Sequence, residues 1–151
     1  MQTAPHSFEA EQSVLGGIML ASMSGDQDRI SAVTKLVKPD SFYGAIHKTI
    51  YASMLALIRN GQPVDLVTLQ AHLDKIGELD RVGGFGYIVE ITKTVPSAAN
   101  VVAYARQVRE HAVRRYAMAK VTDALQMLSE KTTDSLDDQM AAVQGLLAEI
   151  T

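Results

Sequence analysis

The sequence contains no cysteine and no tryptophan, and only 5% of its 151 residues are aromatic. The absence of cysteine excludes disulfides, thiolate metal ligands and thiol nucleophiles. No apolar run approaches the roughly 20 residues that a membrane-spanning helix needs. The first residues, MQTAPHSFEAEQ, lack the basic start of a secretory signal peptide. These absences predict a soluble, cytoplasmic protein without a membrane segment.

Motifs of nucleotide-binding and hydrolytic enzymes are also missing. A P-loop needs two glycines five positions apart followed by lysine and serine or threonine, and the sequence contains no Gly-Lys dipeptide. The stretch GFGYIV supplies two glycines of the Rossmann pattern but ends in valine. The histidines form no i, i+4 pair that could hold a metal: His6, His47, His72 and His111. We therefore expect no catalytic, cofactor-binding or metal-binding residue, and we interpret His47 as a hydrogen-bonded packing residue.

What the sequence does contain is helical periodicity over nearly its whole length. Ser7 and Ser135 are plausible N-caps, each with acidic residues in the turn that follows, and Asp65 is a third. Gly61 and Gly77 are expected to end two further helices. The stretches SMSGDQD and RISAVTKLV predict a loop and a short helix, and SFYGAIHKTIYASMLALIRNG predicts a longer helix. The pattern predicts an all-α fold.

Glycines inside or beside predicted helices indicate close packing. Gly16 and Gly17 lie within the first helix, where each costs roughly 1 kcal/mol relative to alanine. A neighbouring helix that passes very close is the simplest compensation. The stretch VGGFGYIVEI is interpreted in the same way, as a tight turn into a helix that carries Tyr87 to the surface.

The C-terminal third predicts a helical hairpin. Residues 97–128 contain no proline or glycine and carry one apolar stripe: Val101, Ala105, Val108, Ala112 and Ala119. After the turn signal SEKTTDS, a second apolar series repeats at 4-3-4-3 spacing: Leu136, Met140, Val143, Leu147 and Ile150. We therefore predict a compact helical bundle over residues 1–96 and an antiparallel hairpin over 97–151, with helices at about 97–128 and 135–150.

The long predicted helix is basic in a chain whose net charge is −3. Arg106, Arg109 and Arg114 lie broadly opposite its apolar stripe. They can form a solvated face partly neutralised by the acidic second helix, a docking face for an acidic partner, or a nucleic-acid contact. Aromatic residues do not interleave with these arginines as stacking platforms would, so little direct DNA binding is expected.

Five stretches of the chain carry a family resemblance: PHSFEAEQSVLGGIML, SFYGAIHKTIYASMLAL, GQPVDLVTLQAHL, ELDRVGGFGYIVEI and VPSAANVVAYARQVRE. In order and approximate spacing they resemble the N-terminal domain of bacterial DnaB-type replicative DNA helicases. The resemblance covers about residues 5–116. It implies an all-α collar domain of a ring hexamer, built as a trimer of dimers that pair through their hairpins.

The resemblance also implies partners. Primase is expected to dock on the hairpin and nearby bundle residues, and a helicase loader is a further candidate partner. Carried over by motif, the contact candidates are Glu9, Tyr87 and Met118. Each has a purely structural alternative: helix-dipole compensation for Glu9, core packing for Tyr87 and seam packing for Met118.

The RecA-like ATPase motor of that family is absent from these 151 residues. ATP and Mg²⁺ are therefore expected only for such a motor, and no enzyme activity is expected of this chain alone.

The segment around residues 21–29 is longer than is usual for the family. Two other functions remain open: a free-standing phage or mobile-element protein that modulates helicase or primase, and a helical nucleic-acid-binding module.

Overall fold

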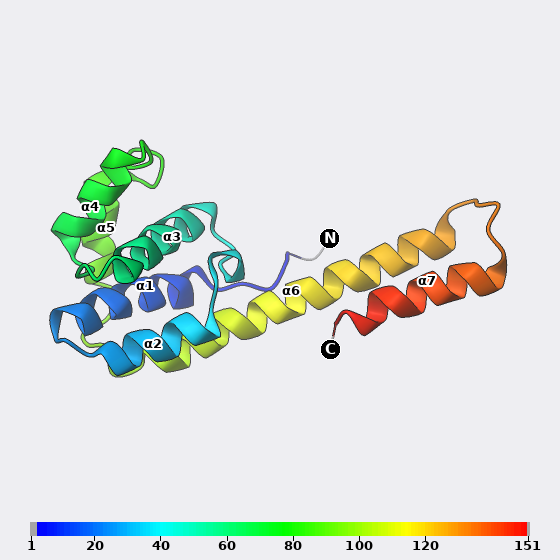
Figure 1. The fold of residues 1–151 in the computed structure, drawn as a ribbon, viewed down its shortest axis with the longest axis horizontal. Helices are drawn as coiled ribbons and strands as arrows, with labels where there is room; N and C mark the ends of the chain where they lie inside the picture. Colours follow the sequence, from blue (N-terminus) through cyan, green and yellow to red (C-terminus); the bar gives the residue numbers. More distant parts are fainter. Residues whose placement is uncertain (1–2, 151) are drawn as a thin grey trace. The chain divides into compact units, whose positions relative to one another are not determined.

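The computed structural model describes residues 3–150, and within them it is all-α, as predicted (Figure 1). Its elements are α1 (Phe8–Met23), α2 (Gln27–Leu36), the 3₁₀ turn η1 (Pro39–Ser41), α3 (Ala45–Arg59), α4 (Leu66–Lys75), α5 (Gly84–Thr92), α6 (Val101–Ser129) and α7 (Leu136–Ala148). None of the helices in residues 3–150 is long and apolar enough to cross a membrane.

The chain forms two compact units. One unit, here called the bundle, is His6–Ala112; the other, here called the hairpin, contains residues 113–150 together with residues 3–5. This boundary lies later than residues 96–97, where the sequence pattern places it. The reason is that Val101, Ala105 and Val108 of α6 are buried in the core of the bundle, so the first turns of the long helix belong to it.

The predicted helix caps are confirmed. Ser7 accepts a hydrogen bond from the Ala10 N–H at 3.1 Å, and Asp65 accepts one from the Thr68 N–H at 2.8 Å. Gly61 and Gly77 have φ angles of +68° and +74°, the left-handed conformation in which glycine commonly ends a helix.

Two predicted boundaries are wrong. The expected loop over residues 22–28 is shorter, because α1 continues to Met23 and Asp26 caps α2 by accepting from the Arg29 N–H at 3.1 Å. The helix expected from residue 41 begins only at Ala45, because the preceding residues form η1 and an extended segment.

Helix α1 lies at the centre of the bundle and contacts α2, α3 and α5. A Cβ atom on Gly16 would lie 2.6 Å from the carbonyl oxygen of Ile91, and one on Gly17 would lie 2.5 Å from Cγ2 of Val101. Both distances are shorter than van der Waals contact. The predicted close approach at these glycines is confirmed, and it comes from α5 and from the start of α6.

In the hairpin, α6 and α7 run side by side in opposite directions (Figure 1). Ser135 caps α7, as predicted, by accepting from the Asp138 N–H at 3.1 Å. In the described part of the hairpin only two apolar side chains are buried, Ala124 and Val143. The hairpin therefore has a thin interior.

The predicted seam of the hairpin is confirmed only in part: Val143 is buried and Ile150 is half-buried. Leu136, Met140 and Leu147 are exposed, and so is Ala119 of α6. The side chain of Gln139 donates to the carbonyl of Met127 at 2.7 Å, in the last turn of α6, where backbone carbonyls lack helical partners. Gln139, which is half-buried, and the buried Val143 therefore lie on the side of α7 that faces α6.

Candidate functional site

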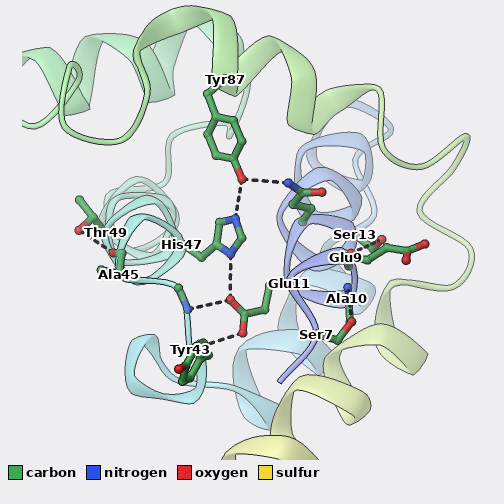
Figure 2. A network of polar contacts seen from close by, with 12 residues as sticks. Ser7, Glu9, Ala10, Glu11, Ser13, Tyr43, Ala45, His47, Thr49 and Tyr87 are labelled. Atoms are coloured by element: carbon green, nitrogen blue, oxygen red, sulfur yellow. Dashed lines mark hydrogen bonds and ion pairs between the residues drawn. The ribbon is translucent and has the colours of Figure 1, made fainter. Parts of the chain in front are cut away.

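A buried polar network joins α1, α3 and α5 (Figure 2). Its centre is Glu11 of α1, whose side chain is 2% exposed. One carboxylate oxygen accepts from the Tyr43 N–H at 2.8 Å. The other accepts from the Gly44 N–H at 3.1 Å and lies 2.8 Å from Nδ1 of His47. Both oxygens of this buried carboxylate therefore have hydrogen-bond partners.

Glu11 acts as the cap of a helix other than its own. Helix α3 has Gly44 at its N-cap, which offers no side chain to bind the free N–H groups of the first turn. The carboxylate of Glu11 accepts from the N–H of Gly44 itself and from that of Tyr43, the residue before it, and places a negative charge at the positive end of the α3 dipole. A Cβ on Gly44 would lie 2.9 Å from Nδ1 of His47 and 3.3 Å from Glu11, so this close approach depends on glycine.

The carboxylate is held in its ionised form. Burial raises the pKa of Glu11, but the hydrogen bonds from His47 and from the N–H groups of Tyr43 and Gly44 more than offset that effect. The pKa of Glu11 is therefore below its ordinary value.

The network continues from His47 to Tyr87. His47 is buried, as predicted for a packing residue, and its Nε2 lies 2.6 Å from the hydroxyl of Tyr87. Gln12 donates to the same hydroxyl at 3.0 Å. Because that bond occupies the hydroxyl as an acceptor, Tyr87 can donate to Nε2, and His47 can then donate from Nδ1 to Glu11. This order of donors satisfies every group.

The glycines before α5 set the position of Tyr87. Gly83 and Gly84 have φ angles of +104° and +73°, a backbone that other residues rarely adopt, and they form the turn that the sequence predicts. The outcome for Tyr87 differs from the prediction, however. Its ring is half-buried and its hydroxyl points inward to His47, not to the surface (Figure 2).

A shallow pocket of about 450 Å³ lies beside the network, with Gln12, His47 and Tyr87 among its lining residues. The side chains exposed on this part of the bundle are apolar or aromatic: Phe8, Tyr43, Ile46 and Phe85. His6 stacks on Tyr43 with ring centroids 4.2 Å apart. Exposed aromatic side chains of this kind are enriched in protein–protein interfaces.

The predicted contact residues divide between the two units. Glu9 is exposed on α1, and its side chain points away from His47 (Figure 2), whereas Tyr87 belongs to the network. Met118 is exposed on the hairpin part of α6. Their roles in binding remain predictions.

The three predicted basic residues are all exposed on α6. Arg106 and Arg109 lie in the bundle and Arg114 in the hairpin. Within residues 3–150, no three histidine or acidic side chains are grouped so as to hold a metal ion.

Sequence reasoning missed the network's central residue. Glu11 looked like a first-turn acid of its own helix, one of two with Glu9. The sequence carried no clear signal for it, because the helix was expected to start at Ser41, whereas in the structure it starts after Gly44.

Comparison with known proteins agrees with this architecture. Residues 3–110 match the family model described as the DnaB-like helicase N terminal domain. The chain belongs to this family. The match ends two residues before the last residue of the bundle.

The relatives of this DnaB-type domain are longer proteins. It is 45% identical over 111 residues to the replicative DNA helicase DnaB of Haemophilus influenzae, an overlap that covers 74% of this chain and 23% of that protein. Across the curated relatives it matches, the chain spans about a quarter to a third of their length.

Two solved structures extend the likeness to the whole DnaB-type domain. The N-terminal domain of DnaB helicase from Mycobacterium tuberculosis aligns with a TM-score of 0.86 at 33% identity, covering 97% of this chain and 99% of that one. A structure described as a DnaB-like replicative helicase and its interactions with primase aligns with a TM-score of 0.75 at 25% identity, covering 96% of this chain and 32% of that one. The first agrees with the all-α fold over nearly the whole chain.

Proposed function

We propose that this chain is the assembly and docking domain of a replicative DNA helicase, with the hairpin joining copies of the chain and primase binding to the domain. The observation that carries the first part is a stripe of exposed apolar side chains on α6. Its members are Met118, Val121, Leu125 and Leu128.

This α6 stripe has the 3-4-3 spacing of a coiled-coil seam. Its members are 44–64% exposed, whereas the apolar side chains buried in the described part of the hairpin are Ala124 and Val143. Leu136, Met140 and Leu147 of α7 are exposed as well, at the spacing that the sequence suggested for an internal seam. Exposed apolar surface of this extent is unusual on a monomer and marks an interface. Pairing of hairpins buries it.

Sedimentation equilibrium tests this pairing. Leu125, at 64% exposed, is central in the α6 stripe, and Leu125→Lys should raise the dimer dissociation constant at least about tenfold. The control is Gln126→Lys, which makes the same charge change on an exposed residue turned away from the stripe. A wild-type chain that stays monomeric at high micromolar concentration, or equal effects of the two variants, contradicts the proposal.

Primase docking is the second part of the proposal. It is supported by the relative solved with primase and by the exposed aromatic surface beside the network. Glu9, whose side chain points away from His47, is the acidic candidate that the family resemblance supplies. Glu9→Lys should weaken binding of the cognate primase domain at least about tenfold if the contact is ionic and partly desolvated. Calorimetry measures this, with Asp74→Lys on α4 as the matched exposed control. If the Glu9→Lys variant binds the primase domain as tightly as the wild type does, Glu9 is not part of the primase contact.

We further propose that unwinding, with its ATP and Mg²⁺, belongs to a motor domain such as the longer relatives possess, and not to these 151 residues. The absence of a P-loop from the sequence supports this. ATP hydrolysis by the purified chain above the rate of a buffer control would contradict it.

A further inference from the structure

All the sulfur of this chain is in methionine. The sequence contains seven methionines and no cysteine, so an oxidant that attacks sulfur can react only with thioethers. In the bundle, Met19 and Met54 are buried at 1% and 0% exposed, whereas Met23, at the end of α1, is 73% exposed. In the hairpin, Met118 and Met140 are 44% and 42% exposed. A dissolved oxidant can therefore reach both of these hairpin side chains but neither of those in the core.

Both hairpin methionines lie among apolar side chains that the proposed pairing covers. Met118 belongs to the α6 stripe, and Met140 is exposed on α7 in the series with Leu136 and Leu147. The other members of these two series are aliphatic and carry no hydrogen-bond donor. A thioether suits such a place, because it is apolar and adapts its shape to its neighbours. A strong hydrogen-bond acceptor at either position would find no donor among these members when pairing removes water from it.

We propose that Met118 and Met140 form a reversible oxidation site that controls pairing of the hairpins, a role that rests on the self-association proposed above. The oxidant is hydrogen peroxide. A lone pair of the thioether sulfur attacks one peroxide oxygen, so that an S–O bond forms while the O–O bond breaks. The sulfur loses two electrons, the peroxide gains them, and the proton of the transferred oxygen leaves with the other oxygen as water. The product is a sulfoxide, which reduction returns to the thioether.

Oxidation and pairing should oppose each other. The sulfoxide oxygen is a strong acceptor that binds water in the single chain, and pairing removes that water without supplying a donor from either series. Two copies of each methionine enter one dimer, so oxidation of both positions should raise the dimer Kd at least about tenfold. Pairing in turn covers the thioethers and keeps peroxide from them. Oxidised chains should therefore accumulate as single chains.

The first experiment treats the 151-residue chain with hydrogen peroxide and locates the sulfoxides by mass spectrometry of its peptides. Below the dimer Kd, the exposed Met23, Met118 and Met140 should all be oxidised, and the two buried methionines of the core should remain thioethers. Above the Kd, oxidation of Met118 and Met140 should slow in proportion to the fraction of chains that are paired, whereas that of Met23 should not. Equal slowing at all three positions, or slowing at none, overturns the proposal.

Sedimentation equilibrium then compares the dimer Kd before and after treatment. For the wild type the treated Kd should exceed the untreated one at least about tenfold. The double variant Met118→Leu, Met140→Leu has no thioether in the two series, so its own ratio of treated to untreated Kd should be about one. Met23→Leu is the matched control, because it removes an exposed thioether of the bundle and should keep the wild-type ratio. Methionine sulfoxide reductases should restore the untreated Kd.

Other results would overturn the assignment. One is a treated wild-type chain that is oxidised at both hairpin positions and still pairs as tightly as before. Another is a double variant that stays sensitive to peroxide, which would assign the effect to a different methionine such as the half-buried Met127. A third is loss of the helical circular dichroism signal on treatment, which would mean that oxidation unfolds the chain.

Failure of this site is distinguishable from failure of the proposed self-association. If the untreated chain does not pair, the self-association fails, and the oxidation site fails with it. If the untreated chain pairs and oxidation leaves its dimer Kd unchanged, only the oxidation site fails.

Discussion

The bundle and the hairpin both contain many apolar residues, but the bundle buries them and the hairpin exposes most of them. In the bundle, apolar side chains from every α-helix form one continuous core around α1. In the described part of the hairpin only Ala124 and Val143 are buried, while a series of large apolar side chains is exposed: Val113, Tyr116, Met118, Val121, Leu125, Leu128, Leu136, Met140 and Leu147. The bundle is stabilised from within, whereas the hairpin presents its apolar surface to a partner.

The largest contrast should come from one substitution made in both units. Gly16→Ala places a methyl group 2.6 Å from the backbone oxygen of Ile91, which cannot rotate away. Forcing α1 and α5 apart should lower the free energy of unfolding by about 2–3 kcal/mol. Urea denaturation followed by circular dichroism measures the change.

Gly145→Ala is the matched variant in the hairpin. Nothing lies within 4 Å of the added methyl group, and the residue is inside α7, where alanine is favoured over glycine by about 1 kcal/mol. The two variants should therefore change stability in opposite directions. Loss of stability in both would show that α7 is packed as tightly as α1.

The next largest effect should come from Glu11→Gln. The amide keeps the size of the side chain but removes the charge that accepts from Tyr43, Gly44 and His47. A loss of about 2 kcal/mol at pH 7 is expected, since hydrogen bonds to a charged group are at stake. Thermal unfolding at several pH values measures it.

The pH dependence has a definite sign. The pKa of Glu11 is lower in the folded chain than its ordinary value of 4.5. The ionised carboxylate therefore stabilises the fold fully above about pH 4.5, and this contribution is lost as the pH falls through the lower folded pKa. Wild type and Glu11→Gln should converge in stability toward acid pH. A constant difference across that range would show that the charge of Glu11 is not what stabilises the fold.

A smaller effect is expected for Tyr87→Phe. The ring remains, but Nε2 of His47 and the amide of Gln12 lose their common partner. Stability should fall by about 1 kcal/mol. If primase affinity falls as well while the aromatic surface stays intact, Tyr87 acts by positioning α5; unchanged affinity together with a stability loss assigns it to structure alone.

The smallest effect should be found on the exposed surface of the hairpin. Leu125→Gln, measured at a concentration where the chain is monomeric, should change the free energy of unfolding by less than about 0.5 kcal/mol. The same change should still weaken self-association. A large loss of stability in the monomer would mean that the α6 stripe packs within the chain after all.

The sequence was sufficient for the parts of the fold that depend on local chemistry. Ser7, Asp65 and Ser135 cap the helices that they were expected to cap, because a cap bonds an N–H only three residues away. Gly16 and Gly17 also revealed a close neighbour, because their cost inside a helix needs compensation. Which helix approaches them was not readable.

What the sequence could not reveal depends on contacts between distant residues. Glu11 caps α3 across 33 residues, and no local pattern distinguishes it from Glu9. The exposure of Leu136, Met140 and Leu147 could not be predicted either, because an apolar series at this spacing fits a seam within the hairpin and a seam with another copy equally well.

The separations of these contacts also imply an order of folding. The bond between Gln12 and Tyr87 joins residues 75 apart, whereas that between Gln139 and Met127 joins residues 12 apart. Closing the longer loop costs about 1.6 kcal/mol more in chain entropy. The turn between α6 and α7 should therefore form before the contact between α1 and α5. During refolding of the whole chain, the apolar stripe of the hairpin should then be available to another copy before the bundle is complete.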